Sequence, residues 1–322
     1  MIDERTIAIG KLELESGVRL RGVEQRVTIY GKPASDGSNV ALVEHALSGS
    51  SRAHEWWPGI VGAGALFDPT HWCVVGINAL GSCYGSTCPA TRVTVADIVR
   101  AERRALQQIG IPRVRVVIGG SLGGMRALQW AIDAPEHVQT AVVVGAHDHH
   151  SSMGIALNAL QREALALDPE RGLRLARKIA MLTYKSEELL SNRHDRRRDR
   201  TGRDCFDVEG YLEHQADLFE RRMDARSYAT LTHAMDSFDV RGFDIPTIKP
   251  ELIFVGITSD WLFRAQDVRA AAWRFALRGF PSRYLQQAST HGHDAFLAEP
   301  DVLRALLEAY LPNVSREAAV AQ

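Results

Sequence analysis

The chain has little of what marks exported, membrane-embedded or nucleic-acid-binding proteins. It has only four cysteines, whose spacing matches no zinc motif, so we expect reduced thiols without a disulfide framework. No apolar run is long enough to span a bilayer, and the first residues, MIDERTIAIGKLELESG, do not resemble a signal or transit peptide. The net charge of −1 gives no reason to expect nucleic acid or an anionic membrane as a partner. These absences favour a cytoplasmic protein.

What the chain does have is enough apolar material for a large α/β core. Its 322 residues, 45% of them hydrophobic, fit two average domains or one large α/β domain with an insertion. Strand-like and helical patterns alternate, which predicts a mostly parallel, doubly wound sheet. The expected strands are an antiparallel ribbon within 17–31, then 39–46, 72–78, 114–120, 138–146, 252–255 and 282–285. The expected helices are 94–110, with Thr94 as N-cap and Gly110 at its end, 266–277 and 300–311.

Between residues 148 and 241 the alternation stops and the pattern is helical almost throughout, over 153–167, 172–184, 208–222 and 225–238. Such a block predicts a helical lid at 148–241 over a core made of residues 1–147 and 242–322. Its arginine-rich stretch 192–204 (NRHDRRRDRTGRD) is expected to be a solvated loop; the alternative is that some of its arginines meet the phosphates of a bulky anionic co-substrate. Residues 313–322 are expected to form a loose tail.

The sequence VRVVIGGSLGGMRALQW, residues 114–130, contains a G-x-S-x-G pattern between a β-branched run and a helix. Such a turn strains the backbone of its serine, here Ser121, and needs very small residues such as Gly119 and Gly123 two places away. The serine hydroxyl then lies at the carboxyl edge of a sheet and at the amino end of a helix, which favours developing negative charge. The pattern predicts that Ser121 is a nucleophile; the alternative is an incidental serine in a glycine-rich turn.

A serine nucleophile needs a base and an acid that orients the base, and in this type of fold the chain order is serine, acid, histidine. Asp260 follows the apolar run LIFVG, and His293 follows the next short strand, in STHGHDAF. We therefore predict a triad of Ser121, Asp260 and His293. Asp260 as an ordinary loop carboxylate, and His293 as a surface histidine, are the alternatives, and His291 is the competing base.

An oxyanion hole needs two backbone donors. The N–H of Leu122, directly after the nucleophile, is one candidate. The other candidate is the N–H of Leu47, in the segment HALSG after an early strand. The alternative is that HALSG is only a turn that ends this strand.

Three histidines at 147, 149 and 150 follow the strand 138–146. A metal site would need two of them on one face and a further ligand, and the sequence shows no partner for them. We therefore predict no metal.

Several long motifs, in order, resemble the homoserine O-acetyltransferases of the α/β-hydrolase superfamily. They are HALSG, WWPGIVGAGALFD, NALGSCYGST, GGSLGGMRALQW, AMDSFD and GHDAFL, and the resemblance spans residues 39 to 311. It implies the same triad, a lid arginine that holds the carboxylate of an amino acid, and an aspartate that meets its amino group. Arg162, in LQREALALDP, and Asp294, in GHD, occupy those places. The resemblance also suggests a homodimer formed through the lid.

The chain departs from the family pattern in three places, one of which is the unusual group of histidines at 147, 149 and 150. Asp168-Pro169 runs almost directly into Arg171-Gly172-Leu173, so the loop that relatives carry there is missing. The usual LTG is LSG, with Ser48.

The resemblance implies ping-pong transfer of an acetyl group from acetyl-CoA to L-homoserine, a step of methionine biosynthesis, through an acyl-serine. Acetyl-CoA is a co-substrate, and no metal or redox cofactor is expected. Two alternatives keep the triad: transfer from succinyl-CoA or to L-serine, and simple ester hydrolysis. Tyr84, in GSCYGST, favours the acetyl donor. A binding protein without activity is disfavoured by the complete order of serine, acid and histidine.

Overall fold

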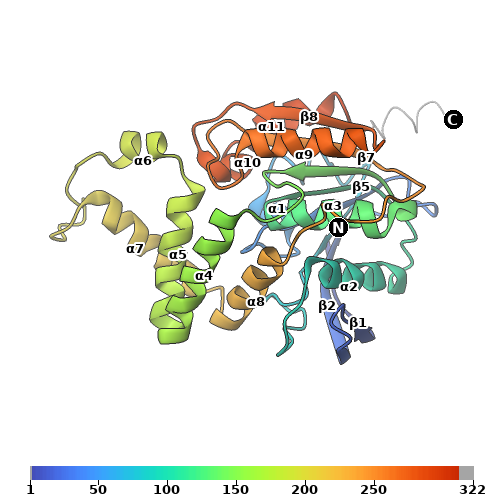
Figure 1. The fold of residues 1–322 in the computed structure, drawn as a ribbon, viewed down its shortest axis with the longest axis horizontal. Helices are drawn as coiled ribbons and strands as arrows, with labels where there is room; N and C mark the ends of the chain where they lie inside the picture. The colour runs from blue at the N-terminus through green and yellow to red at the C-terminus, as the bar shows by residue number, and fades with distance from the viewer. Residues whose placement is uncertain (1, 312–322) are drawn as a thin grey trace.

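An eight-stranded sheet runs through the protein in a computed structural model that describes residues 2–311 (Figure 1). The strands lie in the order β1-β2-β4-β3-β5-β6-β7-β8. β1 and β2 form an antiparallel ribbon, β2 pairs antiparallel with β4, and the six strands from β4 to β8 are mutually parallel. The predicted mostly parallel, doubly wound sheet is confirmed.

The strand bounds follow the predicted runs closely, except at the ribbon. The strands are β1 (Ile2–Glu13), β2 (Arg19–Tyr30), β3 (Val40–Glu44), β4 (Cys73–Ile77), β5 (Val114–Gly120), β6 (Val138–Val144), β7 (Glu251–Ile257) and β8 (Ser282–Gln287). The prediction that both arms of the ribbon lie within 17–31 is wrong, because β1 begins at Ile2. Most β1 side chains are exposed or half-buried, so this strand is held by pairing with β2 and carries little apolar signal.

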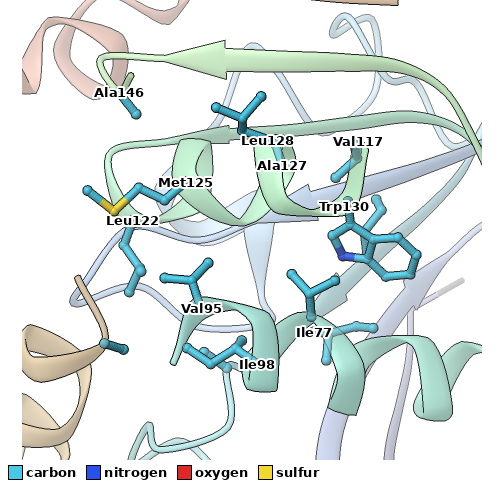
Figure 2. Close-up of a cluster of buried hydrophobic side chains, with 14 of the residues drawn as sticks. Ile77, Val95, Ile98, Val117, Leu122, Met125, Ala127, Leu128, Trp130 and Ala146 are labelled. Atoms are coloured by element: carbon cyan, nitrogen blue, oxygen red, sulfur yellow. The ribbon is translucent and has the colours of Figure 1, made fainter. Parts of the chain in front are cut away.

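Helices cover both faces of the sheet. α2 (Val95–Gln108), α3 (Leu122–Asp133) and α9 (Ala265–Leu277) pack on one face, and α1 (Ala53–Trp56), α10 (Ala295–Ala298) and α11 (Pro300–Glu308) on the other. Figure 2 shows Leu122, Met125 and Leu128 of α3 in the first cluster, above Val95 and Ile98 of α2. Burying each such side chain stabilises the fold by about 1.5–3 kcal/mol.

Helix ends follow local capping chemistry. Thr94 caps α2 as predicted, in a capping box with Asp97, and Gly110 follows the helix with a φ of 76°. α4 (Ser152–Leu167) ends at Asp168, whose carboxylate accepts the N–H groups of Glu170 and Arg171 and so caps α5 (Pro169–Tyr184). One residue therefore joins α4 and α5, at the place where this sequence lacks the loop that is expected from the family resemblance.

Five helices separate β6 from β7, and all lie within residues 148–241. They are α4, α5, α6 (Glu187–His194), α7 (Asp207–Glu220) and α8 (Ala225–Asp236); α6 was not predicted. α4 to α7 lie to one side of the sheet (Figure 1). Buried lid residues such as Phe219, Tyr228 and Leu231 nevertheless belong to the same apolar cluster as α2 and α3. The helical segment 148–241, called the lid below, is therefore packed into the core, and its role as a lid stays a prediction.

Two expectations concern the chain as a whole. None of the helices in the described part is both long and apolar enough to cross a membrane. All four cysteines are free, as expected. The tail predicted at 313–322 lies outside the described residues.

Candidate active site

Ser121 lies in a strained turn between β5 and α3. Its φ is 58° and its ψ is −123°, and within residues 2–311 the only other non-glycine residue with positive φ is Asp195. A Cβ on Gly119 would collide with the backbone of Gly123, and one on Gly123 would collide with the carbonyl oxygen of Glu44. This is the geometry that the G-x-S-x-G pattern predicts, with a strain of about 1–3 kcal/mol held by the surrounding packing. The turn presents the serine at the start of a helix.

Asp260 and His293 meet at the carboxyl ends of β7 and β8. Nδ1 of His293 lies 2.7 Å from Oδ2 of Asp260, and both side chains are buried. Oδ1 of Asp260 accepts the N–H groups of Leu262 and Phe263, each at 2.9 Å, which fixes the carboxylate. Among the described residues, Nε2 of His293 has no hydrogen-bond partner, and His293 lines the same cavity as Ser121. The pair is therefore arranged as an acid that orients a base.

The pKa of His293 predicts where activity falls on acidification. Burial alone would lower this pKa, but the charge of Asp260 and its hydrogen bond outweigh burial and raise it above the ordinary 6.5. Because a general base must be neutral, kcat/KM should fall as pH drops through a pKa above 6.5. A pH–rate profile measures this. In Asp260→Asn the acidic limb should move to lower pH; an unmoved limb would contradict the role of the carboxylate.

The predicted oxyanion loop follows β3 and is fixed by a buried histidine. Ala46, Leu47 and Ser48 line the same cavity as Ser121. Nε2 of His45 accepts the N–H of Ala79 at 2.9 Å, so its Nδ1 carries the proton and donates to the carbonyl oxygen of Ala46 at 2.7 Å. Burial and the charge of Arg126 lower the pKa of His45 to about 3, which keeps the ring neutral. Leu122 begins α3, and its N–H has no acceptor within the helix.

Sequence reasoning missed a buried ion network beneath this loop. Arg126 of α3 is fully buried and contacts both Glu44 of β3 and Glu102 of α2. Its guanidinium also donates to the carbonyl oxygens of His45, at 3.2 Å, and Ile77, at 3.1 Å. An arginine inside the mostly apolar run GGMRALQW was the available signal. The network ties the nucleophile helix to the oxyanion loop.

A cavity of about 160 Å³ joins Ser121, His293 and the oxyanion loop to the lid. The lid supplies three polar side chains that the sequence did not single out: Arg177 and Tyr184 of α5, and Arg222. Arg177 has no ion pair within residues 2–311, and its guanidinium lies 4.8 Å above the ring of Phe219. A free cation therefore lines the cavity.

The two predicted clamp residues lie in different places. Asp294 lines the cavity, and its Oδ2 lies 2.8 Å from Nζ of Lys185. Arg162 does not line the cavity: its Nη2 lies 2.6 Å from Oδ2 of Asp236, at the end of α8. Asn158 donates to the other carboxylate oxygen. In the part of the chain that the structure describes, Arg162 is therefore paired with Asp236 and lies outside the lining of the cavity.

The ring of Phe263 lies between the histidines that follow β6 and His293 of the candidate triad. His150 stacks on Phe263, which stacks on His293. Ligand atoms of His147, Asp148 and His149 lie within 4.8 Å of one another, so two histidines do share a carboxylate neighbour, contrary to the expectation that no partner is near. That carboxylate already accepts two hydrogen bonds from Arg274, at 2.6 and 2.8 Å. The absence of a metal stays a prediction.

Comparisons with known proteins agree with the fold. A family model described as the alpha/beta hydrolase fold matches residues 40–300. A homoserine O-acetyltransferase of Deinococcus radiodurans is 39% identical over 313 residues, covering 93% of this chain and 90% of that protein. A homoserine O-succinyltransferase of Bordetella avium is 34% identical, covering 95% of this chain and 86% of that protein. The crystal structure of homoserine O-acetyltransferase from Staphylococcus aureus matches with a TM-score of 0.82 at 26% identity, covering 96% of this chain and 95% of that one.

Proposed function

This chain belongs to the homoserine O-acetyltransferase family, which has the α/β hydrolase fold, and from this premise we propose that it transfers an acetyl group from acetyl-CoA to the hydroxyl of L-homoserine. The observation that carries the proposal is one cavity in which Ser121 and His293 lie with Arg177 and Asp294. Serine and histidine suit covalent acyl transfer, and the two opposite charges suit the carboxylate and ammonium groups of an amino acid. The proposed reaction uses no metal or redox cofactor.

In the first half-reaction, Nε2 of His293 removes the proton of Ser121 as Oγ attacks the thioester carbonyl carbon. The N–H groups of Leu47 and Leu122 stabilise the oxyanion. The C–S bond then breaks, His293 returns the proton to the sulfur, and the thiol leaves acyl-Ser121 behind. Asp260 holds the ring with its proton on Nδ1 and stabilises the imidazolium.

In the second half-reaction, the hydroxyl of homoserine attacks the acyl-serine carbonyl carbon while His293 removes the hydroxyl proton. The ester bond to Ser121 breaks, and its Oγ regains the proton from His293. Asp294, which lines the cavity and also pairs with Lys185, accepts the substrate's ammonium group in this proposal. We assign the carboxylate to Arg177, because Arg177 lines the cavity and Arg162 is held by Asp236.

The two arginines can be distinguished by substitution. Arg177→Met should raise the KM for homoserine roughly 10- to 100-fold, the usual loss for a hydrogen bond between charged groups, and leave the acylation burst intact. Arg162→Met is the matched control, and we expect its effect mainly on thermal stability, through Asp236. Steady-state kinetics with varied homoserine separates them. A large KM effect only in Arg162→Met would restore the assignment made from the sequence.

A second cation in the cavity favours one alternative donor. Nη1 of Arg222 donates to the carbonyl oxygen of Ser48 at 2.5 Å and lies 3.3 Å from the hydroxyl oxygen of Tyr84. Its charge would suit the free carboxylate of a succinyl group. Succinyl-CoA is therefore the second candidate donor, and L-serine is the alternative acceptor.

Thiol release tests the proposed function directly. The protein is incubated with acetyl-CoA or succinyl-CoA, each with homoserine, with serine and with no amino acid. We expect a burst in each acetyl-CoA reaction and sustained turnover only with homoserine. Equal sustained turnover without any amino acid would show a hydrolase instead.

Exposed apolar side chains on the lid suggest how two copies associate. Met153, Leu160 and Leu167 of α4 are exposed at intervals of seven residues, as are Leu175 and Leu182 of α5. A seven-residue interval places them on one face of each helix, and α4 and α5 pack against each other. In the proposed homodimer these faces meet.

We predict that Leu160→Glu combined with Leu167→Glu converts the dimer to a monomer, because two buried charges per subunit would oppose association. Light scattering coupled to gel filtration measures the mass. Leu277→Glu, on an exposed leucine of α9, is the control and should leave the mass unchanged. A wild-type monomer, or a double variant that remains dimeric, would contradict this interface.

A further inference from the structure

The segment 192–204 between α6 and α7 is the most strongly basic stretch of the lid. It carries six arginines and three aspartates, an excess of three positive charges in a chain whose net charge is −1. All six arginines are exposed. Figure 1 shows the α6–α7 connection at the outer end of the lid, away from the β1–β2 ribbon.

This segment is more ordered than the expected solvated loop. Arg198 and Phe206 form an antiparallel β-bridge. The N–H of Asp207 donates to the carbonyl oxygen of Arg197 at 2.9 Å, and the N–H of Asp199 donates to that of Cys205 at 3.0 Å. The arginines are therefore presented by a small hairpin.

Two of these arginines lie against the same aromatic ring. The guanidinium carbons of Arg196 and Arg198 lie 5.5 and 5.0 Å from the centre of the Phe206 ring. Arg196 has no ion pair within residues 2–311. Nη1 of Arg198 lies 3.5 Å from the fully exposed carboxylate of Asp204, a pair that water screens strongly. Two neighbouring, weakly neutralised guanidinium groups favour a ligand with several negative charges.

The hairpin is connected to the cavity through α6 and α7. α6 begins at Glu187, three residues after Tyr184, which lines the cavity. Tyr211 of α7 packs against His194, with ring centres 4.8 Å apart. Burial and the charge of Asp294 raise the pKa of Tyr211, while Arg177 and Arg193 oppose this rise. Tyr211 therefore lies near charged groups of both the cavity (Asp294 and Arg177) and the arginine-rich segment (Arg193).

We propose that Arg196 and Arg198 bind the phosphate groups of the acyl-CoA donor. The inference rests on the proposed function. With the thioester at Ser121, the long pantetheine arm would extend from the cavity along α6 and α7, and the donor's negative charges would arrive at the hairpin. Arginine pairs bind phosphate oxygens through several parallel hydrogen bonds.

The test compares two acetyl donors that differ in their phosphates. Acetyl-CoA carries them, and S-acetyl-N-acetylcysteamine retains only the thioester end. In Arg196→Glu/Arg198→Glu, kcat/KM for acetyl-CoA should fall about 10- to 100-fold, because positive charges at a binding site raise the association rate of an anionic ligand by such factors. The dependence of this kcat/KM on salt concentration should also weaken, because fewer attractive charges remain for salt to screen. Use of the short donor should be unchanged, which also shows that the variant is folded. Arg19→Glu/Arg21→Glu, with the same spacing and charge change on β2, is the matched control.

Equal losses with both donors, no loss with either, or an equal loss in the control would overturn the proposal. If the unsubstituted protein transfers acyl groups from neither donor, the proposed function has failed. Calorimetric titration with CoA then still tests the arginine pair. Binding that is weakened by Arg196→Glu/Arg198→Glu and kept by the control supports the phosphate site, whereas equal binding by all three proteins rejects it.

Discussion

Ser121→Ala should abolish the burst of thiol release from acetyl-CoA and lower kcat by at least about 10⁴-fold, as removal of the nucleophile does in serine enzymes. This expectation rests on where Ser121 lies in the structure. Ser121 is the residue that the strained turn presents to the cavity, which His293 also lines; within residues 2–311, Nε2 of His293 has no hydrogen-bond partner. Alanine removes only the hydroxyl, so the thermal unfolding temperature should change little. Stopped-flow detection of thiol and mass spectrometry of the acyl-enzyme measure the effect.

A pair of histidine variants provides the control for this prediction. His293→Ala should lose activity on a similar scale, whereas His291→Ala should retain it, because His291 lies outside the cavity although it is only two residues away. A burst that survives in Ser121→Ala, with acetyl still attached to the protein, would assign the nucleophile elsewhere.

Arg126→Met should lower the free energy of unfolding by about 3–5 kcal/mol, the usual cost of removing one partner from a buried ion network. Glu44 and Glu102 are both fully buried, and the substitution leaves them facing each other without a cation. Burial and Glu102 raise the pKa of Glu44, and Arg126 opposes this rise. Urea unfolding followed by circular dichroism measures the loss.

Two comparisons separate the buried network from ordinary ion pairing. Arg174, on the surface of α5, pairs with Glu213, Asp217 and Glu220, and its replacement by methionine should cost about 1 kcal/mol or less. Adding Glu44→Gln and Glu102→Gln to Arg126→Met should recover part of the loss, because the uncompensated charges are gone. A loss near 1 kcal/mol in Arg126→Met itself would show that the network contributes little.

Most of the sheet and the lid helices were predictable because their signals are local. Buried parallel strands such as β3 and β6 are continuous apolar runs, and the cap Thr94 marks the start of α2. β1 was missed because an exposed strand that gains its stability from a partner needs no apolar pattern of its own. α6 was missed for a similar reason, since only its last residue, His194, is buried.

The same distinction between local and long-range signals applies to the candidate site. The turn at Ser121 depends on glycines two residues away, and the chain order of Asp260 and His293 follows from the order of the strands. The clamp arginine depends on how α4 and α5 pack, which local spacing does not reveal. Arg162 and Arg177 lie on these successive helices, yet only Arg177 lines the cavity.

The sequence by itself therefore determined the α/β architecture, the strained turn at Ser121 and the chain order of the three predicted catalytic residues. These depend on backbone sterics and on hydrophobic period, which act over a few residues. Only the tertiary structure decided which charges face the cavity, that Asp236 holds Arg162, and that Arg126 lies fully buried between two glutamates. Those outcomes depend on side chains that are far apart in the sequence and meet only in the fold. Burial and charge pairing, and not sequence spacing, decide which of these side chains pair.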